Sequence, residues 1–307
     1  MSTALITHRD CQRHDMGRHH PECPERLQAI EDQLIASGVI GTVVEYEAPL
    51  AERDQLTRVH APDYVDAIAA ASPVAGIVHL DPDTAMNPYS HTAALRAAGA
   101  SVLATDLVLQ GKARNAFCYV RPPGHHAERH RAMGFCFFNN VAVGAAHALA
   151  VHGLDRVAVV DFDVHHGNGT EDIFRDDERV LMVSTFQHPF YPYSGIEGRS
   201  ERMVNVPLPA YTDGAGFRRA VEANWLPALD RFRPQALFIS AGFDAHREDD
   251  MASLGLVEAD YAWVTKRIVA AAEAHAQGRI VSMLEGGYNL SALGRSAVAH
   301  VKVLAGV

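Results

Sequence analysis

Short apolar runs alternate with longer amphipathic segments along most of the chain. The runs are rich in Val, Ile, Leu, Phe and Ala and have the length of about five residues expected of strands buried on both faces. They lie at 4–7, 43–46, 116–120, 156–160, 180–184, 236–240 and 279–284. Parallel strands need a crossover between them, and that crossover is usually a helix. The alternation therefore predicts a mostly parallel α/β sheet.

Segments with helical periodicity connect these runs. The first follows Pro24, carries an apolar stripe of Leu27, Ile30 and Leu34, and ends at Gly38, as a helix with proline in its first turn and glycine after its last does. Further helices are expected at 52–59, 62–71, 91–110, 140–151, 171–175, 217–229, 259–276 and 290–304, and ordered loops at 72–90 and 187–209. We find no linker, low-complexity tract or internal repeat. The sequence predicts one domain over residues 1–307, doubly wound, with helices on both faces of the sheet.

Composition and charge exclude several classes of function. The 307 residues are 48% hydrophobic and 21% charged, which is ordinary for a globular protein. The formal net charge of −10 disfavours binding to a phosphate backbone. No uninterrupted apolar run reaches the roughly 18 residues of a membrane span, and no signal peptide is evident. Four cysteines without CxxC spacing suit a reducing compartment. We expect a cytoplasmic protein without a nucleic-acid or membrane partner.

Reactive side chains follow directly after four of the predicted strands. One strand runs into the segment Asp161-Phe162-Asp163-Val164-His165-His166-Gly167-Asn168-Gly169. Others are followed by His125-His126, by Asp244 and by Tyr288. Ligands bind open parallel sheets at the edge where the carboxyl ends of the strands lie. The four loops are therefore expected to meet in one crevice.

Two aspartates and a histidine in these loops have the composition of a catalytic metal site. Side chains alternate along an extended strand end, so Asp161, Asp163 and His165 project to one side. Asp163, His165 and Asp244 then offer three ligands with a fourth position open, which is the arrangement of catalytic zinc. Fe²⁺ and Mn²⁺ are compatible with the same ligand types. A polar turn without metal is the alternative interpretation of the 161–169 segment taken alone.

The remaining polar groups suit acid–base chemistry on a metal-bound water. The tandem His125-His126 follows a rigid Pro-Pro-Gly turn and offers two imidazoles for proton transfer. Asp161 and Asn168 flank the ligands and could fix the imidazole tautomers. Two glycines allow Tyr288 to approach the ion, where its hydroxyl could donate to a developing oxyanion. The alternative for Tyr288 is a half-buried tyrosine in a turn.

Together these motifs resemble the zinc-dependent histone deacetylase family, which includes acetylpolyamine amidohydrolases and has the arginase/deacetylase fold. The resemblance covers nearly the whole chain. It rests most strongly on Arg121-Pro122-Pro123-Gly124-His125-His126, Gly134-Phe135-Cys136, the 161–169 segment and Ser240-Ala241-Gly242-Phe243-Asp244-Ala245. The HPE-x-PERL start at 20–27 and the EGGYN end at 285–289 resemble the class II branch and its bacterial relatives.

The resemblance implies a catalytic role for each of these groups. Asp163, His165 and Asp244 would bind Zn²⁺. His126 would be the general base, and His125, held by Asp161, its electrostatic partner. Asn168 stands where the class I branch has an aspartate that orients the second imidazole. Tyr288 would polarise the amide carbonyl and stabilise the oxyanion.

It also implies a substrate channel and a second ion. The Gly134 carbonyl would accept the substrate amide N–H, and Phe135 and Tyr191 would form the walls of a narrow channel. Tyr191 departs from the usual phenylalanine, and the alignment of 190–193 is open to a shift by one residue. Arg26 resembles an arginine that lines an acetate exit path. A structural K⁺ would bind near Asp161, Asp163, His165, Ser184 and Thr185.

The implied activity is zinc-dependent removal of an acyl group, such as acetyl, from the Nε of lysine or from a similar amine. The expected partner is accordingly an acyl-lysine peptide or protein or a small acyl-amine, and a homo-oligomer is left open. Acetylpolyamine hydrolysis is the nearest alternative, although Met251 stands where the polyamine-selective eukaryotic branch has Glu. A non-catalytic acyl-binding or scaffold protein is an alternative of another class. A two-metal arginase-like hydrolase is disfavoured by Tyr288 and the tandem histidines.

Overall fold

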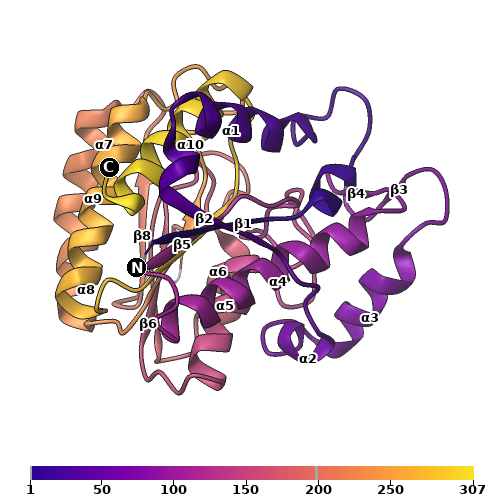
Figure 1. Ribbon diagram of the computed structural model, residues 1–307, viewed down its shortest axis with the longest axis horizontal. Coiled ribbons are helices and arrows are strands. Elements are labelled where there is room, and N and C mark those ends of the chain that lie inside the picture. Colours follow the sequence, from indigo (N-terminus) through magenta and orange to yellow (C-terminus); the bar gives the residue numbers. More distant parts are fainter. Residues whose placement is uncertain (1, 198–199) are drawn as a thin grey trace.

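An eight-stranded parallel sheet runs through the centre of the molecule (Figure 1). The computed structural model describes residues 2–197 and 200–307. The strand order is β2-β1-β5-β10-β9-β6-β7-β8, and every neighbouring pair is parallel. The strands are β1 (Thr3–Thr7), β2 (Val43–Glu47), β5 (Asn115–Cys118), β6 (Val157–Asp161), β7 (Val180–Gln187), β8 (Met203–Leu208), β9 (Leu237–Ala241) and β10 (Ile280–Leu284). The predicted parallel α/β sheet is confirmed.

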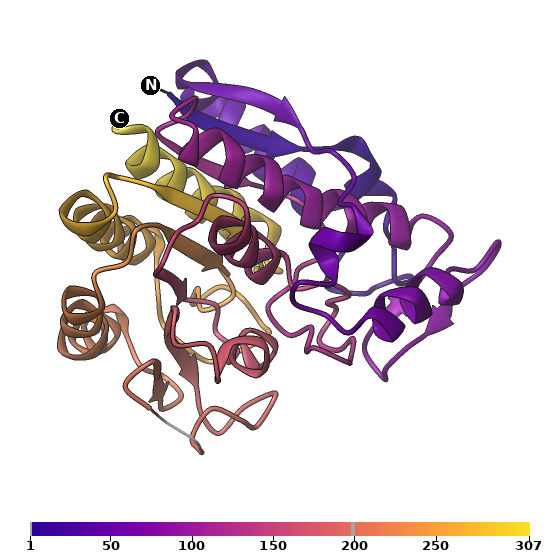
Figure 2. The same cartoon turned by 90° about the horizontal axis from the view of Figure 1, so that it is seen from below.

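Helices cover both faces of this sheet (Figures 1 and 2). On one face α4 (Ser90–Leu109), α5 (Asn140–Ala150) and α6 (Asn168–Phe174) pack in sequence. On the other, α10 (Leu290–Ala305) packs between α1 (Glu25–Ala36) and α9 (Glu258–His275), and α8 (Leu226–Phe232) packs on α9. Helix α7 (Gly214–Ala220) leads into α8 and also packs on α9. Outside these layers lie α2 (Arg53–Leu56), α3 (Pro62–Ala71) and a two-stranded hairpin of β3 (Val78–His79) and β4 (Ala85–Met86).

The structure corrects three predicted elements. The segment 187–209, expected as a loop, contains the edge strand β8, which the sequence obscures because Pro207 interrupts it. The helix expected at 217–229 begins at Gly214 and passes through a π-helical turn (Val221–Trp225) just before Pro227. The helix expected from residue 171 begins at Asn168. That earlier start places a predicted site residue in the first turn of α6.

Helix α4 is long and apolar enough to cross a membrane by length and composition, with a mean hydropathy of 1.3 over its window. Two observations assign it to the protein core instead. Of that window, 67% is buried inside the fold. Arg96 on the same helix donates to Asp10 Oδ2 at 3.0 Å and to the Ala48 carbonyl at 2.8 Å. It is the only such helix in the part of the chain that the structure describes.

A neutral histidine is buried between α10 and the sheet. His300 Nδ1 lies 2.7 Å from Thr265 Oγ1, and its Nε2 lies 2.9 Å from Ser282 Oγ. The Thr265 hydroxyl donates to the Tyr261 carbonyl, so it accepts from Nδ1–H, and Ser282 donates to Nε2. Burial lowers the pKa of His300 from 6.5 to about 3. The folded core therefore excludes a proton that the unfolded chain binds.

This difference predicts an acid-sensitive stability. Between pH 6 and 3 the unfolded state binds the additional proton, so the free energy of unfolding contributed by His300 decreases as the pH falls, by about 1.4 kcal/mol per pH unit. The glutamine of His300→Gln cannot titrate. The slope of its unfolding free energy against pH should therefore be smaller than that of the parent, by up to about 1.4 kcal/mol per pH unit. Urea unfolding at pH 7, 6 and 5 measures both slopes. Equal slopes for the two proteins would contradict the assignment.

Candidate active site

Five adjacent strands in the middle of the sheet deliver the predicted site. In the order β5-β10-β9-β6-β7, the loop after each strand carries at least one predicted site residue, which for β7 is Tyr191. The register places Asp161, at the end of β6, opposite Ser184 of β7 and Ser240 of β9. The loops that hold His125-His126, Tyr288, Asp244 and Asp163–His165 therefore leave the same sheet edge side by side. The predicted convergence is present.

Asp163, His165 and Asp244 form a buried cluster in which one potential ligand atom from each residue lies within 4.8 Å of the others. His165 Nδ1 is 3.0 Å from Asp163 Oδ1 and 3.2 Å from Asp244 Oδ2. Asp244 Oδ1 accepts from the Val164 N–H at 2.9 Å, whereas the buried Asp244 Oδ2 accepts no hydrogen bond from the described residues and has only the 3.2 Å approach of His165 Nδ1. A buried carboxylate oxygen without a donor is costly unless a cation compensates it.

The charges around this cluster fit a divalent cation. Burial raises the pKa of Asp244, and the Asp163 carboxylate raises it further, to about 6. A side chain on Gly286 could not be accommodated, because a Cβ there would lie 2.0 Å from Asp244 Oδ2 and 2.6 Å from Asp163 Oδ2. The Gly286 N–H instead donates to Asp163 Oδ2 at 2.8 Å. Two carboxylates and one imidazole are the donor types of catalytic zinc, so the residues present fit the metal.

The tandem histidines stand beside the cluster with different partners. His125 Nδ1 is 3.0 Å from Asp161 Oδ2, and His126 Nδ1 is 2.7 Å from Asn168 Oδ1. Burial lowers the pKa of His125, but the charges of Asp163 and Asp161 outweigh it and raise this pKa to about 10. Burial, together with the charges of His125 and His165, lowers the pKa of His126 well below its ordinary value. The pair is therefore one protonated and one neutral imidazole.

A buried arginine packs against the ring of Tyr288. Arg26 is fully buried and lies with its Cζ 5.0 Å from the centre of the Tyr288 ring. Its guanidinium donates to the carbonyls of Gly287 at 2.6 Å and Glu285 at 2.5 Å. Asp249 Oδ2 accepts from the Tyr288 N–H at 2.6 Å. The loop that presents the phenol is thus fixed on both sides.

A cavity of about 290 Å³ opens above these groups. Its lining includes the predicted Gly134, Phe135, Tyr191 and Met251, together with His126, His165 and Tyr288, and also Asp83 and Phe190. Phe190 stacks on the His165 ring at 5.4 Å, and Tyr191 meets the His126 ring edge-on at 5.3 Å. Both residues of the uncertain 190–191 pair therefore line the cavity.

Gly134 is required by its backbone. Its φ is +58°, and a Cβ there would lie 2.4 Å from His126 Cδ2. The Gly134 carbonyl accepts from Cys136 Sγ at 3.2 Å. Sequence reasoning did not assign Asp83 to the site, because Asp83 lies in the loop expected at 72–90, and it left Phe190 open as the alternative to Tyr191. The turn prediction for Asp83 was reasonable, because Asp side chains are common in turns, and only the fold shows that the turn faces the cavity.

Comparisons with known proteins agree with this geometry. A sequence profile described as histone deacetylase domain matches residues 20–304. The chain belongs to the histone deacetylase family. A probable deacetylase of Archaeoglobus fulgidus is 38% identical over 298 residues, which cover 94% of this chain and 82% of that protein. The histone deacetylase-like amidohydrolase of Pseudomonas aeruginosa is 39% identical over 295 residues, with 94% and 77% covered.

Membership of the histone deacetylase family is supported by structure as well. The crystal structure of the HDA15 HD domain matches with a TM-score of 0.92 at 35% identity and covers 99% of this chain and 88% of that chain. The polyamine deacetylase HDAC10 of Homo sapiens is 36% identical over 328 residues, which cover 100% of this chain and 48% of that protein. The expected arginase/deacetylase fold and deacetylase-type hydrolase family are confirmed.

A second group of one carboxylate and two imidazoles lies away from this site. Asp106 Oδ1 is 2.9 Å from His147 Nε2 and 2.6 Å from His152 Nε2. Arg58 Nη1 donates to His147 Nδ1 at 2.8 Å, so the His147 proton is on Nε2 and faces Asp106. The atoms of this second cluster are held together by hydrogen bonds.

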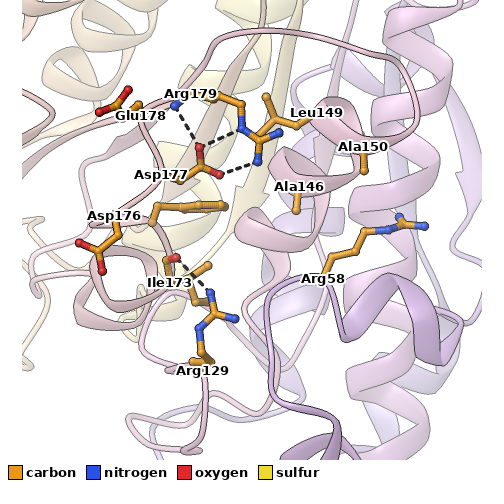
Figure 3. Close-up of a pocket in the computed structure, with 11 residues that line it drawn as sticks. Arg58, Arg129, Ala146, Leu149, Ala150, Ile173, Asp176, Asp177, Glu178 and Arg179 are labelled. Carbon is orange, nitrogen blue, oxygen red and sulfur yellow. Dashed lines mark hydrogen bonds and ion pairs between the residues drawn. The ribbon is translucent and has the colours of Figure 1, made fainter.

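A large cavity of about 650 Å³ lies near that cluster (Figure 3). Arg179 donates to both carboxylate oxygens of Asp177, at 2.9 and 2.7 Å, and Arg129 Nη2 donates to the Ile173 carbonyl at 3.4 Å. Two of its three arginines are thus engaged, Arg179 with Asp177 and Arg129 with the backbone.

Proposed function

We propose that the protein is a zinc-dependent deacetylase that hydrolyses the acetyl or other acyl amide of a lysine Nε or a similar primary amine. One observation carries the proposal. The Asp163, His165 and Asp244 cluster adjoins an aromatic-walled cavity through His165, and His126 and Tyr288 line the same cavity. Membership of the histone deacetylase family supports it.

The residues divide the chemistry between them. Zinc held by Asp163, His165 and Asp244 would polarise the substrate carbonyl and acidify a bound water. His126, which is neutral, accepts the proton of the attacking water through Nε2, because its Nδ1 faces Asn168 Oδ1. The phenol of Tyr288, whose pKa burial keeps well above its ordinary value, stays protonated and donates to the oxyanion.

The charged His125 assists proton transfer by His126. Its Nδ1–H donates to Asp161, and its positive charge lies beside His126 with ring centres 4.0 Å apart. In that position it stabilises negative charge developing on the substrate and, by repulsion, favours release of the proton from His126 to the leaving amine. Gly134 lines the cavity, and its carbonyl would accept the substrate amide N–H.

The cavity suits an unbranched alkyl stem. Phe135 and Tyr288 meet edge to face at 5.9 Å, and Phe190 and Tyr191 lie against the imidazoles. Aromatic walls of this kind bury methylene groups, so the cavity suits the alkyl stem of an acylated amine.

Direct assay tests the proposal. Zinc-loaded protein should hydrolyse an acetyl-lysine peptide, and the rate should fall when a chelator removes the metal and return when zinc is added. Absence of turnover on acetyl-lysine peptides and on N-acetylputrescine, with zinc shown to be bound, would favour the non-catalytic acyl-binding alternative.

Acetylpolyamine hydrolysis is the second candidate, and one residue favours it. Asp83 lines the cavity, and its Oδ1 accepts from the Gly134 N–H at 3.2 Å, so a carboxylate stands near the path of a second ammonium. Asp249, another acidic residue near Met251, is instead occupied by the backbone of the Tyr288 loop. The ratio of kcat/KM for N-acetylputrescine and an acetyl-lysine peptide separates the two substrates. If polyamines are the substrate, Asp83→Asn should lower kcat/KM for N-acetylputrescine and leave kcat/KM for the acetyl-lysine peptide unchanged.

A structural K⁺ near Asp161, Asp163, His165, Ser184 and Thr185 stays part of the proposal. The buried Ser184 Oγ has no hydrogen-bond partner among the described residues, and a K⁺ would coordinate this oxygen. The cytoplasmic location, the lack of nucleic-acid and membrane partners, the single domain and any homo-oligomer stay predictions from the sequence.

Tyr288→Phe tests the oxyanion role. The substitution removes only the hydroxyl and leaves the ring between Arg26 and Phe135, so fold and zinc content should not change. The value of kcat should fall by about 10²-fold or more, as on loss of one oxyanion donor. Steady-state kinetics on the zinc-loaded variant measures it. Turnover within about threefold of the parent would refute the role of the phenol.

A further inference from the structure

Behind the tandem histidines, Asn168 has a second partner. Its Oδ1 faces His126 Nδ1 at 2.7 Å, while its Nδ2 donates to Glu128 Oε1 at 2.7 Å. The Met133 Sδ, at 3.3 Å, is the other acceptor near Nδ2 and a weak one. The three residues form a chain from a carboxylate through an amide to the general base. We propose that Glu128 is a positioning residue that fixes the orientation of the Asn168 amide and, through it, the tautomer of His126.

The physical argument concerns which atoms can donate. An amide presents an oxygen on one side and an NH₂ group on the other, and it can turn over at little cost unless its neighbours decide. An ionised carboxylate only accepts, so Glu128 requires Nδ2 on its side and leaves Oδ1 facing His126. Because Oδ1 only accepts, the His126 proton is placed on Nδ1, and Nε2 keeps the lone pair that general-base catalysis needs. The reversed amide would place that proton on Nε2 and block the base.

Glu128 is held in place independently of Asn168. Its N–H donates to the Arg131 carbonyl at 2.9 Å, and its carbonyl lies 2.9 Å from His60 Nδ1. His60 Nε2 accepts from the Asn139 N–H at 2.9 Å, so Nδ1 is the donor to Glu128. Burial lowers the pKa of His60 to about 4, which keeps this ring neutral. The Glu128 backbone is thus held by hydrogen bonds that do not involve Asn168.

The surroundings explain why a carboxylate is needed rather than water. Glu128 and Asn168 both line a cavity of about 710 Å³ that is separate from the substrate cavity. Water in that cavity could bond to either end of the amide, because it both donates and accepts. Only an acceptor without protons selects one orientation. The inference rests on the proposed function for its kinetic consequences, and the tautomer itself is independent of turnover.

Kinetics of zinc-loaded variants tests the proposal. Glu128→Ala should lower kcat by about 10- to 100-fold, with KM little changed. Losses of this size follow substitution of residues that orient a metal ligand through a hydrogen bond. Glu128→Gln, which keeps an acceptor oxygen, should lose less. The matched control is Asp172→Ala, since Asp172 Oδ2 accepts from the Arg129 N–H next to Glu128 at 2.9 Å, and the Asn168 amide bonds to His126, Glu128 and Met133 instead. Equal losses in the alanine variants at 128 and 172, or Glu128→Ala within about threefold of the parent, would overturn the proposal.

Moving the negative charge gives a test that a structural role would not pass. Asn168→Asp alone places two carboxylates in contact and should be poorly active. In the double variant Asn168→Asp, Glu128→Gln, the amide at 128 donates and the carboxylate at 168 accepts from His126, so kcat should recover by about tenfold or more over Asn168→Asp. No recovery would contradict the proposal.

Nitrogen-15 NMR of the histidine rings separates this inference from the proposed function. In the zinc-loaded parent the His126 signals should show the Nδ1–H tautomer, and Glu128→Ala should give a mixture of tautomers. This result is expected even if the substrate class is wrong. A parent protein with the Nε2–H tautomer would refute the positioning role, whereas lack of turnover with the Nδ1–H tautomer present would refute only the deacetylase assignment.

Discussion

Asp244→Asn is expected to remove zinc binding and, with it, nearly all deacetylase turnover. Asp244 Oδ2 is the atom of the cluster that lies buried without a donor, 3.2 Å from His165 Nδ1. The amide keeps the shape of the side chain but removes one negative charge from the three ligands. Substitutions behind a metal ligand already cost 10- to 100-fold in affinity, so loss of a ligand charge should cost more than about 10²-fold. Zinc per chain after dialysis, measured beside kcat, gives both losses.

The second His/Asp group provides the control for this experiment. Asp106→Asn changes the same chemical group in a cluster that hydrogen bonds account for. The parent and Asp106→Asn should both hold one zinc ion per chain, and Asp244→Asn should hold almost none. A parent with two zinc ions, one of them lost in Asp106→Asn, would contradict the one-metal site. So would an Asp244→Asn variant that keeps its zinc.

The convergence of the site was predictable because it follows from strand order alone. Reactive residues that directly follow apolar runs must lie at one edge of a parallel sheet, whatever the helices do. The side-chain alternation after β6 was enough to group Asp163 with His165, and the loop after β9 adds Asp244. Strand β8 was missed because its Pro207 and edge position weaken the apolar pattern on which strand prediction depends.

Groups that act through long-range contacts could not be predicted in this way. Glu128 follows the tandem histidines by two residues in the sequence, but only α6, which begins at Asn168, brings the amide to it. Phe190 faces the metal cluster because the loop after β7 turns back over His165. Arg26 is on an amphipathic helix where periodicity allows either face. Its burial against the Tyr288 ring depends on the hydrogen bond to the Glu285 carbonyl, which is 259 residues away in the sequence. Local patterns carry no information on such pairs.

Glu22→Gln is expected to destabilise the fold more than any surface substitution. Glu22 is fully buried, and its carboxylate accepts from Arg26 Nη1 at 2.9 Å and from Arg121 Nη2 at 2.7 Å, with a further bond to Arg121 Nε. Burial opposes ionisation of Glu22, but Arg121, His14 and Arg26 outweigh it and hold its pKa well below the usual range. Glutamine leaves two guanidinium charges without a counter-charge, at a cost of about 3–5 kcal/mol.

Urea unfolding at pH 7 measures this loss, and Glu25→Gln is the matched control. Glu25 is exposed in the first turn of α1, the helix that carries Arg26, and there a carboxylate contributes less than about 1 kcal/mol through the helix dipole. Because Arg26 also supports the Tyr288 ring, Glu22→Gln should lower kcat under conditions in which the variant is still folded, and Glu25→Gln should not. Equal stabilities of the two variants would show that the buried arginines find other partners. The charge of Glu22 would then be unnecessary both to the core and to the position of the phenol.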